Sequence, residues 1–498
     1  MALSAAAFVV RRACSLQSMQ HRLARISIVP ELLTLAGFDF GTTTSSAVFA
    51  TARVTKSRVS GRMELTDVIE RYRSPMIFTP MKGERLLDLA ALQAAVLGWL
   101  SAAALTAPLF GGGALLTGLA AQSKNASELI TLLRGVIGEG VVATADDPRL
   151  ESWLAFMGGT AALSRAAPQE SFLNLDIGGG TTNLALGSNG EITATGCVLV
   201  GARHVRVVPG SYVIAGLSSY AQAAFAELGI RPRIGEVLER SDVDALLGFY
   251  EDLLFRVVSG APAAGRSHAA QLHVQAEYRG PYSSANAVVT FSGGVGALMS
   301  DLLAGKDPGI TPFGDLGVDL ARSLLAKPRW SNRMQPLPSQ HAGRVTSMGM
   351  MRHATMVSGA SIYLPRAELL PMRDLPLLGV VNSETTERHW LELLSLIETS
   401  RNGGCFFVVL GTANPAVVRK VGDAIAKALR QAALPADRPI ALLVDVNAGK
   451  ALGHYATAWG AVPAALVVID EIEPRAAQFV RIGAPAQQVV PVSFFGMG

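Results

Sequence analysis

The sequence predicts an α/β protein that contains two related lobes. Apolar segments of strand length alternate with segments of helical period over most of the chain, an order typical of α/β domains. A hairpin with the same turn chemistry occurs twice, as GFDFGTTTSS at 37–46 and as NLDIGGGTTN at 174–183. At 498 residues the chain is also too long for one ordinary core. A repeated hairpin at the start of each half therefore predicts two subdomains of similar fold.

Composition excludes several classes of protein. The chain carries 43 basic and 39 acidic residues and shows no basic stripe, so it does not resemble a nucleic-acid-binding protein. Its cysteines, Cys14, Cys197 and Cys405, are too far apart in sequence to indicate a zinc site or a disulfide framework. We therefore expect a reducing, cytoplasmic location.

One segment resembles a targeting signal and another resembles a membrane span. Residues 1–32 form an N-terminal extension. Its residues 1–30 contain four arginines and no acidic residue and so resemble a mitochondrial transit peptide, although a disordered extension or a start codon placed too far upstream is the preferred interpretation. Residues 89–123 carry no charge and are long enough to cross a bilayer, but proline and glycine interrupt them. We expect a core helix at 89–104, a loop at 108–113 and a strand at 114–117, without stable membrane insertion.

Hydrophobic periodicity assigns the remaining elements. Helices are predicted at 123–138, 148–163, 211–227, 241–258, 296–304, 314–326, 386–399, 415–432 and 447–459. Strands outside the two hairpins are predicted at 140–144, 286–291, 343–350, 404–410, 439–445 and 464–469. The polar segments 259–285 and 327–342 are expected to be surface insertions.

These elements predict three domains after the N-terminal extension. The first lobe is expected at 33–165, the second lobe with its insertions at 166–375, and a C-terminal α/β region at 376–498.

The repeated turns have the chemistry of a phosphate site. Glycine lets the backbone approach a ligand, successive N–H groups bind anions, and threonine hydroxyls add donors. Asp39 and Asp176, each beside its turn, could hold a hydrated Mg²⁺. The predicted phosphate ligands are Gly41, Thr42, Thr43 and Thr44 in the first turn, and Gly178, Gly179, Gly180, Thr181 and Thr182 in the second. Either aspartate could instead only cap its own turn, but the duplication favours a shared nucleotide site.

Further residues extend this hypothesis. TFSGGVGALM at 290–299 ends a strand and opens a helix, so that Gly293 and Gly294 would let a nucleoside lie against the backbone. Gly349 is predicted to line the same pocket. Glu151, at the start of a helix, could orient a water molecule, although an acidic residue is also favoured there by the helix dipole.

The order of these three turns resembles that of the actin-like ATPases, which include heat-shock chaperones, sugar kinases and actin. The resemblance implies two lobes of duplicated ribonuclease-H-like subdomains, with ATP and Mg²⁺ bound in the cleft between them. Asp39, Asp176 and Glu151 would then be the catalytic residues.

Other segments narrow the resemblance. They are ALLTGLAAQSKNA (114–126), VVATADDPRLESWLAFMGGTAAL (141–163), HAGRVTSMGMMRHATMVSGASIYLP (341–365), LLVDVNAGKALG (442–453) and FVRIGAPAQQVVPVSFF (479–495). From about residue 33 onward the chain is similar to the large reactivating factor of ethanolamine ammonia-lyase, the EutA family. This resemblance implies an ATP-driven chaperone that releases damaged cobalamin from the ammonia-lyase so that adenosylcobalamin can bind again.

Several alternatives remain open at this stage. The family commonly has Gly-Ala-Gly where this chain has Gly349, Met350 and Met351, so Met351 either narrows the nucleoside pocket or is a core residue. A small-molecule kinase would need a catalytic aspartate, and Asp146 and Asp147 lie near the expected place. A nucleotide-binding scaffold, a different cobalamin-dependent client, a homo-oligomer and association with a microcompartment are likewise compatible with the sequence. His204 is expected at the surface and Asn125 in a structural role.

Overall fold

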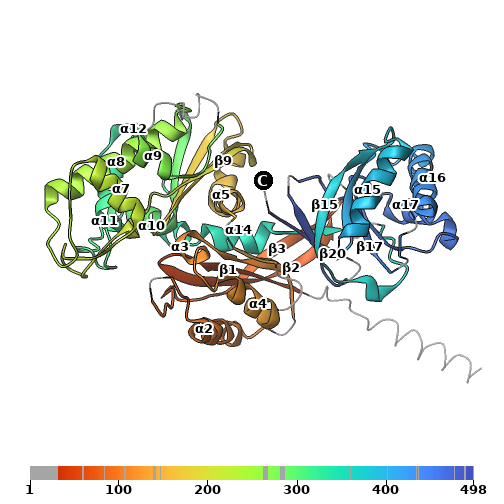
Figure 1. Ribbon diagram of the computed structural model, residues 1–498, viewed down its shortest axis with the longest axis horizontal. Helices are drawn as coiled ribbons and strands as arrows, with labels where there is room; N and C mark the ends of the chain where they lie inside the picture. The colour runs from red at the N-terminus through yellow and green to blue at the C-terminus, as the bar shows by residue number, and fades with distance from the viewer. Residues whose placement is uncertain are drawn as a thin grey trace, which may run out of the picture.

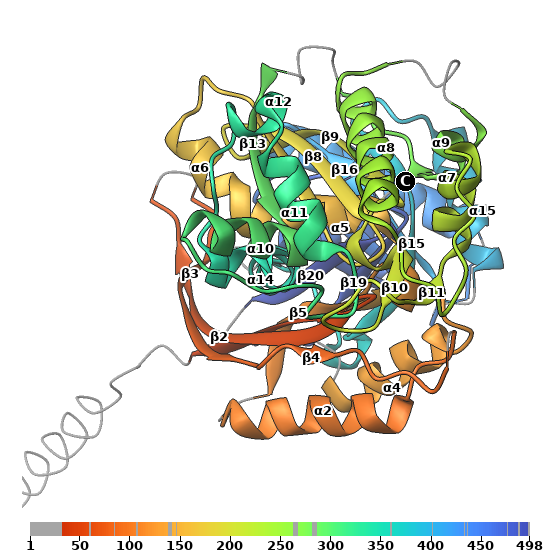
Figure 2. The ribbon, with the colours of Figure 1, turned by 90° about the vertical axis from the view of Figure 1, so that its left-hand side faces the viewer.

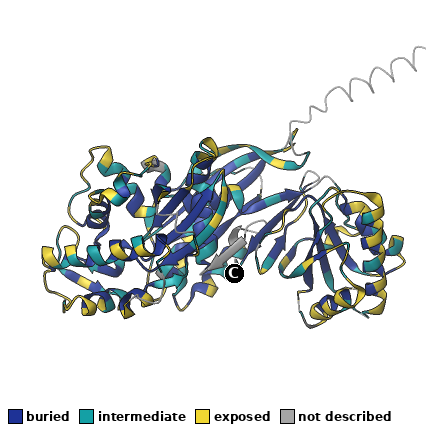
Figure 3. Cartoon of the chain, turned by 90° about the horizontal axis from the view of Figure 1, so that it is seen from above, coloured by how far each residue is buried: buried dark blue, intermediate teal, exposed yellow. Residues whose placement is uncertain are grey.

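The chain folds into three parts, each with its own β-sheet (Figure 1). The computed structural model describes residues 32–496 except 59–60, 84, 106–107, 138–141, 146, 262–266, 281–285, 359–360, 401, 433, 436, 476 and 487–488. The N-terminal extension up to residue 31 therefore lies outside the described residues. Within the described ranges, no helix is both long and apolar enough to cross a bilayer. Most strand residues of the sheets are buried, and exposed residues gather on the outer helices and loops (Figure 3).

The first sheet has the strand order β3-β2-β1-β5-β6, in which β1 to β3 are antiparallel and β5 and β6 run parallel to β1. Its strands are β1 (Leu33–Phe40), β2 (Thr44–Lys56), β3 (Met63–Arg73), β5 (Leu109–Leu116) and β6 (Val142–Ala145). The short β4 (Ile77–Phe78) pairs with the start of β2. Helices α2 (Leu89–Ala102), α3 (Gly118–Ala121) and α4 (Ala126–Ile137) belong to this part, and α2 and α4 lie below the sheet (Figure 2).

The second sheet has the order β12-β9-β8-β7-β13, with β7 to β9 antiparallel and β13 parallel to β7. Its strands are β7 (Phe172–Ile177), β8 (Thr182–Ser188), β9 (Glu191–Val198), β12 (Val274–Ala276) and β13 (Val288–Ser292). Both sheets thus begin with a three-stranded antiparallel meander and add a parallel strand beside its first strand. This repeated topology confirms the predicted duplication and the α/β class.

Helices and a two-stranded sheet complete the second lobe. The helices are α7 (Ser219–Glu227), α8 (Arg240–Val258), α9 (His268–Leu272), α10 (Gly293–Leu303), α11 (Gly317–Leu325), α12 (Pro328–Ser331) and α13 (Ser339–Ala342). The small sheet pairs β10 (Val205–Val207) with β11 (Ile214–Leu217). The helix predicted at 211–227 is therefore wrong in its first half, because β11 precedes α7.

The C-terminal part contains a seven-stranded sheet of order β14-β20-β19-β15-β16-β17-β18, in which β15 to β18 are parallel. Its strands are β14 (Thr355–Ser358), β15 (Met372–Asn382), β16 (Gly404–Val409), β17 (Pro439–Val444), β18 (Ala465–Ile469), β19 (Phe479–Ile482) and β20 (Val490–Phe495). Helices α15 (Glu387–Thr399), α16 (Pro415–Gln431) and α17 (Gly449–Ala456) share one hydrophobic core with the parallel strands. The alternation predicted for this region is confirmed.

Two helical segments join the three parts. The first consists of α5 (Pro148–Ala155), a π-helical turn (Phe156–Thr160) and α6 (Ala161–Ala166), and leads from the first lobe into the second. The second is α14 (Val345–His353), which lies in the middle of the molecule, packs against α5, β1 and β5, and leads into β14 (Figure 1).

The strand predicted at 343–350 is wrong, because this segment is the helix α14. Glycines on its neighbours allow the helix to approach closely: a Cβ atom on Gly37 would lie 1.8 Å from the Ser347 carbonyl oxygen. A Cβ atom on Gly158 would lie 1.9 Å from the Val345 carbonyl oxygen. Tertiary packing thus outweighs the strand preference of the β-branched residues that open this segment.

The loop predicted at 108–113 is also wrong, since β5 begins at Leu109. Its glycines are in the strand because larger residues would collide with neighbouring elements. A Cβ atom on Gly113 would lie 2.0 Å from the Met350 sulfur, and one on Gly111 would lie 2.8 Å from the Thr355 hydroxyl oxygen. These glycines serve close packing rather than a turn.

Gly349→Ala is expected to lower the free energy of unfolding by about 1–3 kcal/mol, the usual range for overpacking a core. The added Cβ atom would lie 2.0 Å from the Leu154 carbonyl oxygen of α5. Gly248→Ala in α8 is the matched control, because its Cβ atom would meet nothing within 4 Å and should stabilise the helix by about 0.5–1 kcal/mol. Equal melting temperatures for the two variants would contradict this packing.

Candidate functional site

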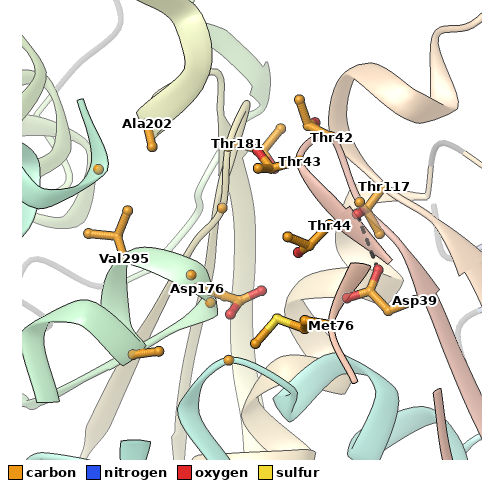
Figure 4. A pocket seen from close by; sticks show the side chains of 18 of the residues that line it. Asp39, Thr42, Thr43, Thr44, Met76, Thr117, Asp176, Thr181, Ala202 and Val295 are labelled. Atoms are coloured by element: carbon orange, nitrogen blue, oxygen red, sulfur yellow. Dashed lines mark hydrogen bonds between the residues drawn. The ribbon is translucent and has the colours of Figure 1, made fainter. Parts of the chain in front are cut away.

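The two repeated turns face each other across a cavity of about 320 Å³ (Figure 4). The first turn (residues 41–44) connects β1 to β2, and the second turn (residues 178–181) connects β7 to β8. The same hydrogen bond closes both: the Gly41 N–H donates to the Thr44 carbonyl at 2.9 Å, and the Gly178 N–H donates to the Thr181 carbonyl at 2.9 Å. The duplicated sequence therefore produces duplicated geometry.

Most of the predicted site residues lie at this cavity. They are Asp39, Gly41, Thr42, Thr43, Thr44, Glu151, Asp176, Gly178, Gly179, Thr181, Gly293 and Gly294. They come from both lobes and from the start of α10, so that residues more than 250 positions apart in sequence meet here.

Three predicted residues are not among those that line the cavity. The Gly180 carbonyl faces His204 instead, and the Thr182 hydroxyl donates to the Val200 carbonyl at 2.8 Å. Gly349 lies in α14 against Leu154 of α5, so its role is in helix packing. Gly349 therefore does not line the cavity, contrary to its prediction as a pocket residue.

Met351 belongs to the hydrophobic core. It is 1% exposed and packs in a cluster with Leu35 and Val48 of the first sheet. Of the two interpretations that the sequence left open, the structure supports the core residue.

Three carboxylates line the cavity, of which Asp176 and Glu151 are buried and Asp39 is half-buried. Asp39 and Asp176 each occupy the second-last position of the first strand of their sheets, and Glu151 is in the first turn of α5. Burial raises the pKa of Asp39 to about 7, with a further contribution from the Asp176 charge, and the hydrogen bond from Thr117 opposes this shift. The pKa of Glu151 is also raised, by burial first and then by the charges of both aspartates.

Hydroxyl groups hold both aspartates in place. Ser292 donates to one oxygen of Asp176 at 2.7 Å, and Thr346 of α14 donates to the other at 3.3 Å. Burial nevertheless raises the pKa of Asp176 to about 6. Thr117 donates to Asp39 at 3.4 Å. The sequence offered a signal only for Ser292, which directly precedes the glycine pair of α10.

The ionisable side chains among the described lining residues of the cavity are all acidic. Five carboxylates line it and no lysine, arginine or histidine does. The carboxylate residues are Asp39, Glu151, Asp176, Asp301 and Asp315. An anionic ligand can therefore bind here only through backbone N–H groups, hydroxyls and an accompanying cation.

The donor set fits Mg²⁺ carried by a nucleotide better than a resident metal. In the part of the chain that the structure describes, no three acidic, histidine or cysteine side chains converge as a self-sufficient metal site would require. Mg²⁺ commonly uses one or two carboxylates, keeps several waters and takes its remaining ligands from phosphates. Asp39 and Asp176 supply such a pair of carboxylates.

The two turns are in close contact. A Cβ atom on Gly179 would lie 2.1 Å from the Thr43 hydroxyl oxygen. The Thr43 hydroxyl is buried and has no hydrogen-bond partner among the described atoms. A buried hydroxyl without a described partner therefore lies at the contact between the lobes.

Apolar side chains also line the cavity. They are Met76, Phe78, Leu298 and Phe313, and Met76 lies between Asp39 and Asp176 in Figure 4. Phe78 and Phe313 remain 58% and 43% exposed, so they are available to contact a planar ligand. Sequence reasoning could not find these residues, because neither the short β4 nor the loop before α11 carries a recognisable motif.

His204 is buried, not at the surface as predicted. It is 0% exposed, contacts the second turn and lies among Tyr220, Tyr250 and His273. Asn125 is structural as expected, because its side-chain amide bonds both backbone groups of Leu87.

Asp147 is occupied by structural hydrogen bonds. One of its oxygens accepts from the Leu150 N–H and caps α5, while the other accepts from the Gly496 N–H at 2.9 Å. Asp146 lies outside the described residues. The candidate base that a kinase would need is therefore not free at position 147.

Acidification is expected to destabilise the protein through His204. Burial lowers the pKa of His204 to about 4. Between pH 6.5 and 4, His204 is therefore protonated in the unfolded chain but still neutral in the folded chain. This difference costs up to about 3 kcal/mol by pH 4. Urea unfolding of the unchanged protein and of His204→Gln measures this loss of stability, which should be absent in the variant. The carboxylates titrate in both proteins, so their contribution cancels in the comparison. Identical pH dependence in the two would contradict a buried neutral histidine.

Comparison with known proteins places these features in a family. A family model described as "Ethanolamine utilisation protein EutA" matches residues 31–495. The chain is 30% identical over 486 residues to the ethanolamine ammonia-lyase reactivase EutA of Salmonella typhimurium, covering 93% of this chain and 97% of that protein. It is 29% identical, with the same coverage, to the protein of that name from Escherichia coli K12.

Among solved structures, the Ppx/GppA phosphatase of Aquifex aeolicus is similar with 13% identity and a TM-score of 0.31, over 56% of this chain and 73% of that one. The family model and the full-length matches together establish the relationship. The chain belongs to the EutA family of ethanolamine utilisation proteins.

Proposed function

We propose that this protein is an ATP-dependent reactivase of ethanolamine ammonia-lyase, which promotes exchange of damaged cobalamin for intact adenosylcobalamin. The family match from residue 31 to residue 495 carries this proposal, since it spans the lobes and the C-terminal part alike. Two reactivases are 30% and 29% identical to this chain, each over 93% of its length. The partner would be the ammonia-lyase, encountered in the cytoplasm or in a microcompartment.

The cavity offers suitable chemistry for slow ATP hydrolysis. The N–H groups of both turns and the threonine hydroxyls would bind phosphate oxygens, and the exposed aromatic side chains of Phe78 and Phe313 would contact the base. Asp39 and Asp176 would hold hydrated Mg²⁺, which supplies charge neutralisation to the phosphates when bound. Glu151 carries a raised pKa and would orient a water molecule or accept its proton.

Nucleotide binding can drive remodelling only if the nucleotide prefers one arrangement of the lobes. Such a preference is supported by the position of the two turns, which belong to different lobes and touch each other at Thr43 and Gly179. A ligand that bridges the turns would stabilise the arrangement in which they are close. Hydrolysis would remove part of that bridge and favour separation.

The decisive experiment uses ammonia-lyase that has been inactivated by bound cyanocobalamin. Purified protein with Mg-ATP and free adenosylcobalamin should restore deaminase activity, and omission of ATP should prevent this. Failure of restoration with folded protein and an intact client would refute the proposal. Restoration of a different cobalamin enzyme, but not of the ammonia-lyase, would reassign the client.

A further inference from the structure

The segment from Gly201 to His204, here called the brace, packs against the carbonyl side of the second turn. Three of its groups bind three successive carbonyl oxygens of the turn. The Ala202 N–H donates to Gly178 at 3.1 Å, and the Arg203 N–H donates to Gly179 at 2.6 Å. The His204 ring Nε2 lies 2.8 Å from the Gly180 carbonyl oxygen.

The brace depends on close backbone contact. A Cβ atom on Gly201 would lie 2.6 Å from both the carbonyl carbon and the carbonyl oxygen of Gly179. This distance is too short for any residue except glycine, so Gly201 lets the brace reach the turn. The contact at Gly180 differs from the other two, because it is made by a side chain.

The hydrogen bonds of His204 define its tautomer. A carbonyl oxygen can only accept, so Nε2 carries the proton that it donates to Gly180. Nδ1 must then accept, and it lies 2.9 Å from the Ser218 hydroxyl oxygen. Ser218 caps α7 by accepting from the Ala221 N–H at 3.1 Å, which leaves its own proton for Nδ1. One chain of hydrogen bonds thus runs from α7 to the turn.

These bonds determine the direction of donors in the turn. In a trans peptide the carbonyl of one residue and the N–H of the next point in opposite directions. With the carbonyls of Gly178, Gly179 and Gly180 directed at the brace, the N–H groups of Gly179, Gly180 and Thr181 point away from it. Gly179 and Thr181 line the cavity, so two of these three N–H groups belong to cavity residues and are placed to donate to a phosphate.

We infer that His204 is a positioning residue for the phosphate site, which holds the Gly180–Thr181 peptide in the orientation that presents its N–H to the nucleotide. The inference rests on the proposed nucleotide site and extends it to a residue outside the cavity wall. His204 need not touch the nucleotide, since it acts through the peptide that it binds.

The test measures Mg-ATP affinity by titration with a fluorescent ATP analogue, together with melting temperature. His204→Phe keeps a ring in the aromatic cluster and removes the donor, and we expect about tenfold weaker binding. His204→Gln can place an amide N–H near the position of Nε2, so affinity should return to within about threefold of the unchanged protein.

His273→Phe is the matched control. His273 is also a buried histidine of the same cluster, but its Nδ1 is 2.7 Å from the Ala269 carbonyl and no recorded bond links it to the turn. It should therefore lose stability without losing affinity. Wild-type affinity in folded His204→Phe, or an equal loss in His273→Phe, would overturn the inference.

A third variant covers the case in which His204→Phe does not fold. Ser218→Ala removes the hydroxyl that fixes the tautomer and should weaken Mg-ATP binding about threefold, and unchanged affinity would count against the inference. Failure of the unchanged protein to bind Mg-ATP would overturn both the nucleotide site and the inference. Normal Mg-ATP binding without reactivation would refute only the proposed function, and the His204 variants would then decide the inference alone.

Discussion

Asp39→Asn and Asp176→Asn are each expected to reduce Mg-ATP-dependent reactivation about a hundredfold and to raise the melting temperature of the metal-free protein. Loss of a metal-binding carboxylate weakens Mg²⁺ binding. Even mutation of a residue that only orients a metal ligand typically lowers metal affinity or activity by about 10–100-fold. Stability should rise because burial already raises the pKa of both carboxyl groups, which shows that their charges are costly in the folded state. Reactivation assays and thermal unfolding in EDTA measure the two effects.

Asp423→Asn provides the control for these substitutions. Asp423 is exposed on α16, where its partner Arg419 is also exposed, so the change should alter neither activity nor melting temperature. Full activity in Asp39→Asn and Asp176→Asn would remove both residues from the metal site. Loss of activity together with a lower melting temperature would indicate a structural role instead.

Removal of Mg²⁺ is expected to weaken ATP binding at least about a hundredfold. A triphosphate brings several negative charges into a cavity whose described wall has five carboxylates and no cationic side chain. Each uncompensated charge at close range costs about 1–4 kcal/mol at the effective dielectric constants of water and protein surfaces. The measurement is a titration of ATP into protein in EDTA, followed by addition of excess Mg²⁺.

Recovery of binding on addition of Mg²⁺ is the internal control for that experiment. Tight binding of ATP in EDTA would show that the phosphates find their counter-charge elsewhere. A basic residue from outside the described cavity wall would then have to be sought, and the metal site assigned to Asp39 and Asp176 would lose its main support.

The paired turns could be predicted from sequence because their chemistry is local. A glycine that closes a hairpin, a threonine that donates and an aspartate at the strand end all lie within a few residues of one another. Each turn forms by bonds within itself, such as that from Gly41 to Thr44. The repeat then implied two subdomains of similar fold, and the two sheets do share the same arrangement of an antiparallel meander with a parallel strand beside its first strand.

Other features depend on residues that are distant in sequence. The segment at 345–353 begins with the β-branched Val345 and Thr346 and resembles a strand by composition, yet packing against β1, β5 and α5 makes it a helix. Phe78 and Phe313 likewise both line the cavity, although they are far apart in sequence and belong to no local pattern. His204 resembled a surface residue because neighbouring arginines suggested solvent, whereas its ring turns inward to Gly180.

The central position of α14 has a mechanical consequence for the molecule. Its first turn bonds Asp176 of the second lobe through Thr346, and β14 of the C-terminal sheet begins at Thr355, directly after it. The C-terminal part is also tied to the first lobe, by Arg134 with Asp374 at 3.3 Å and by the bond of Gly496 to Asp147. We therefore expect the first lobe and the C-terminal part to rotate together relative to the second lobe. A small rotation at the proposed nucleotide site would then produce its largest displacement at the distant surface of α16.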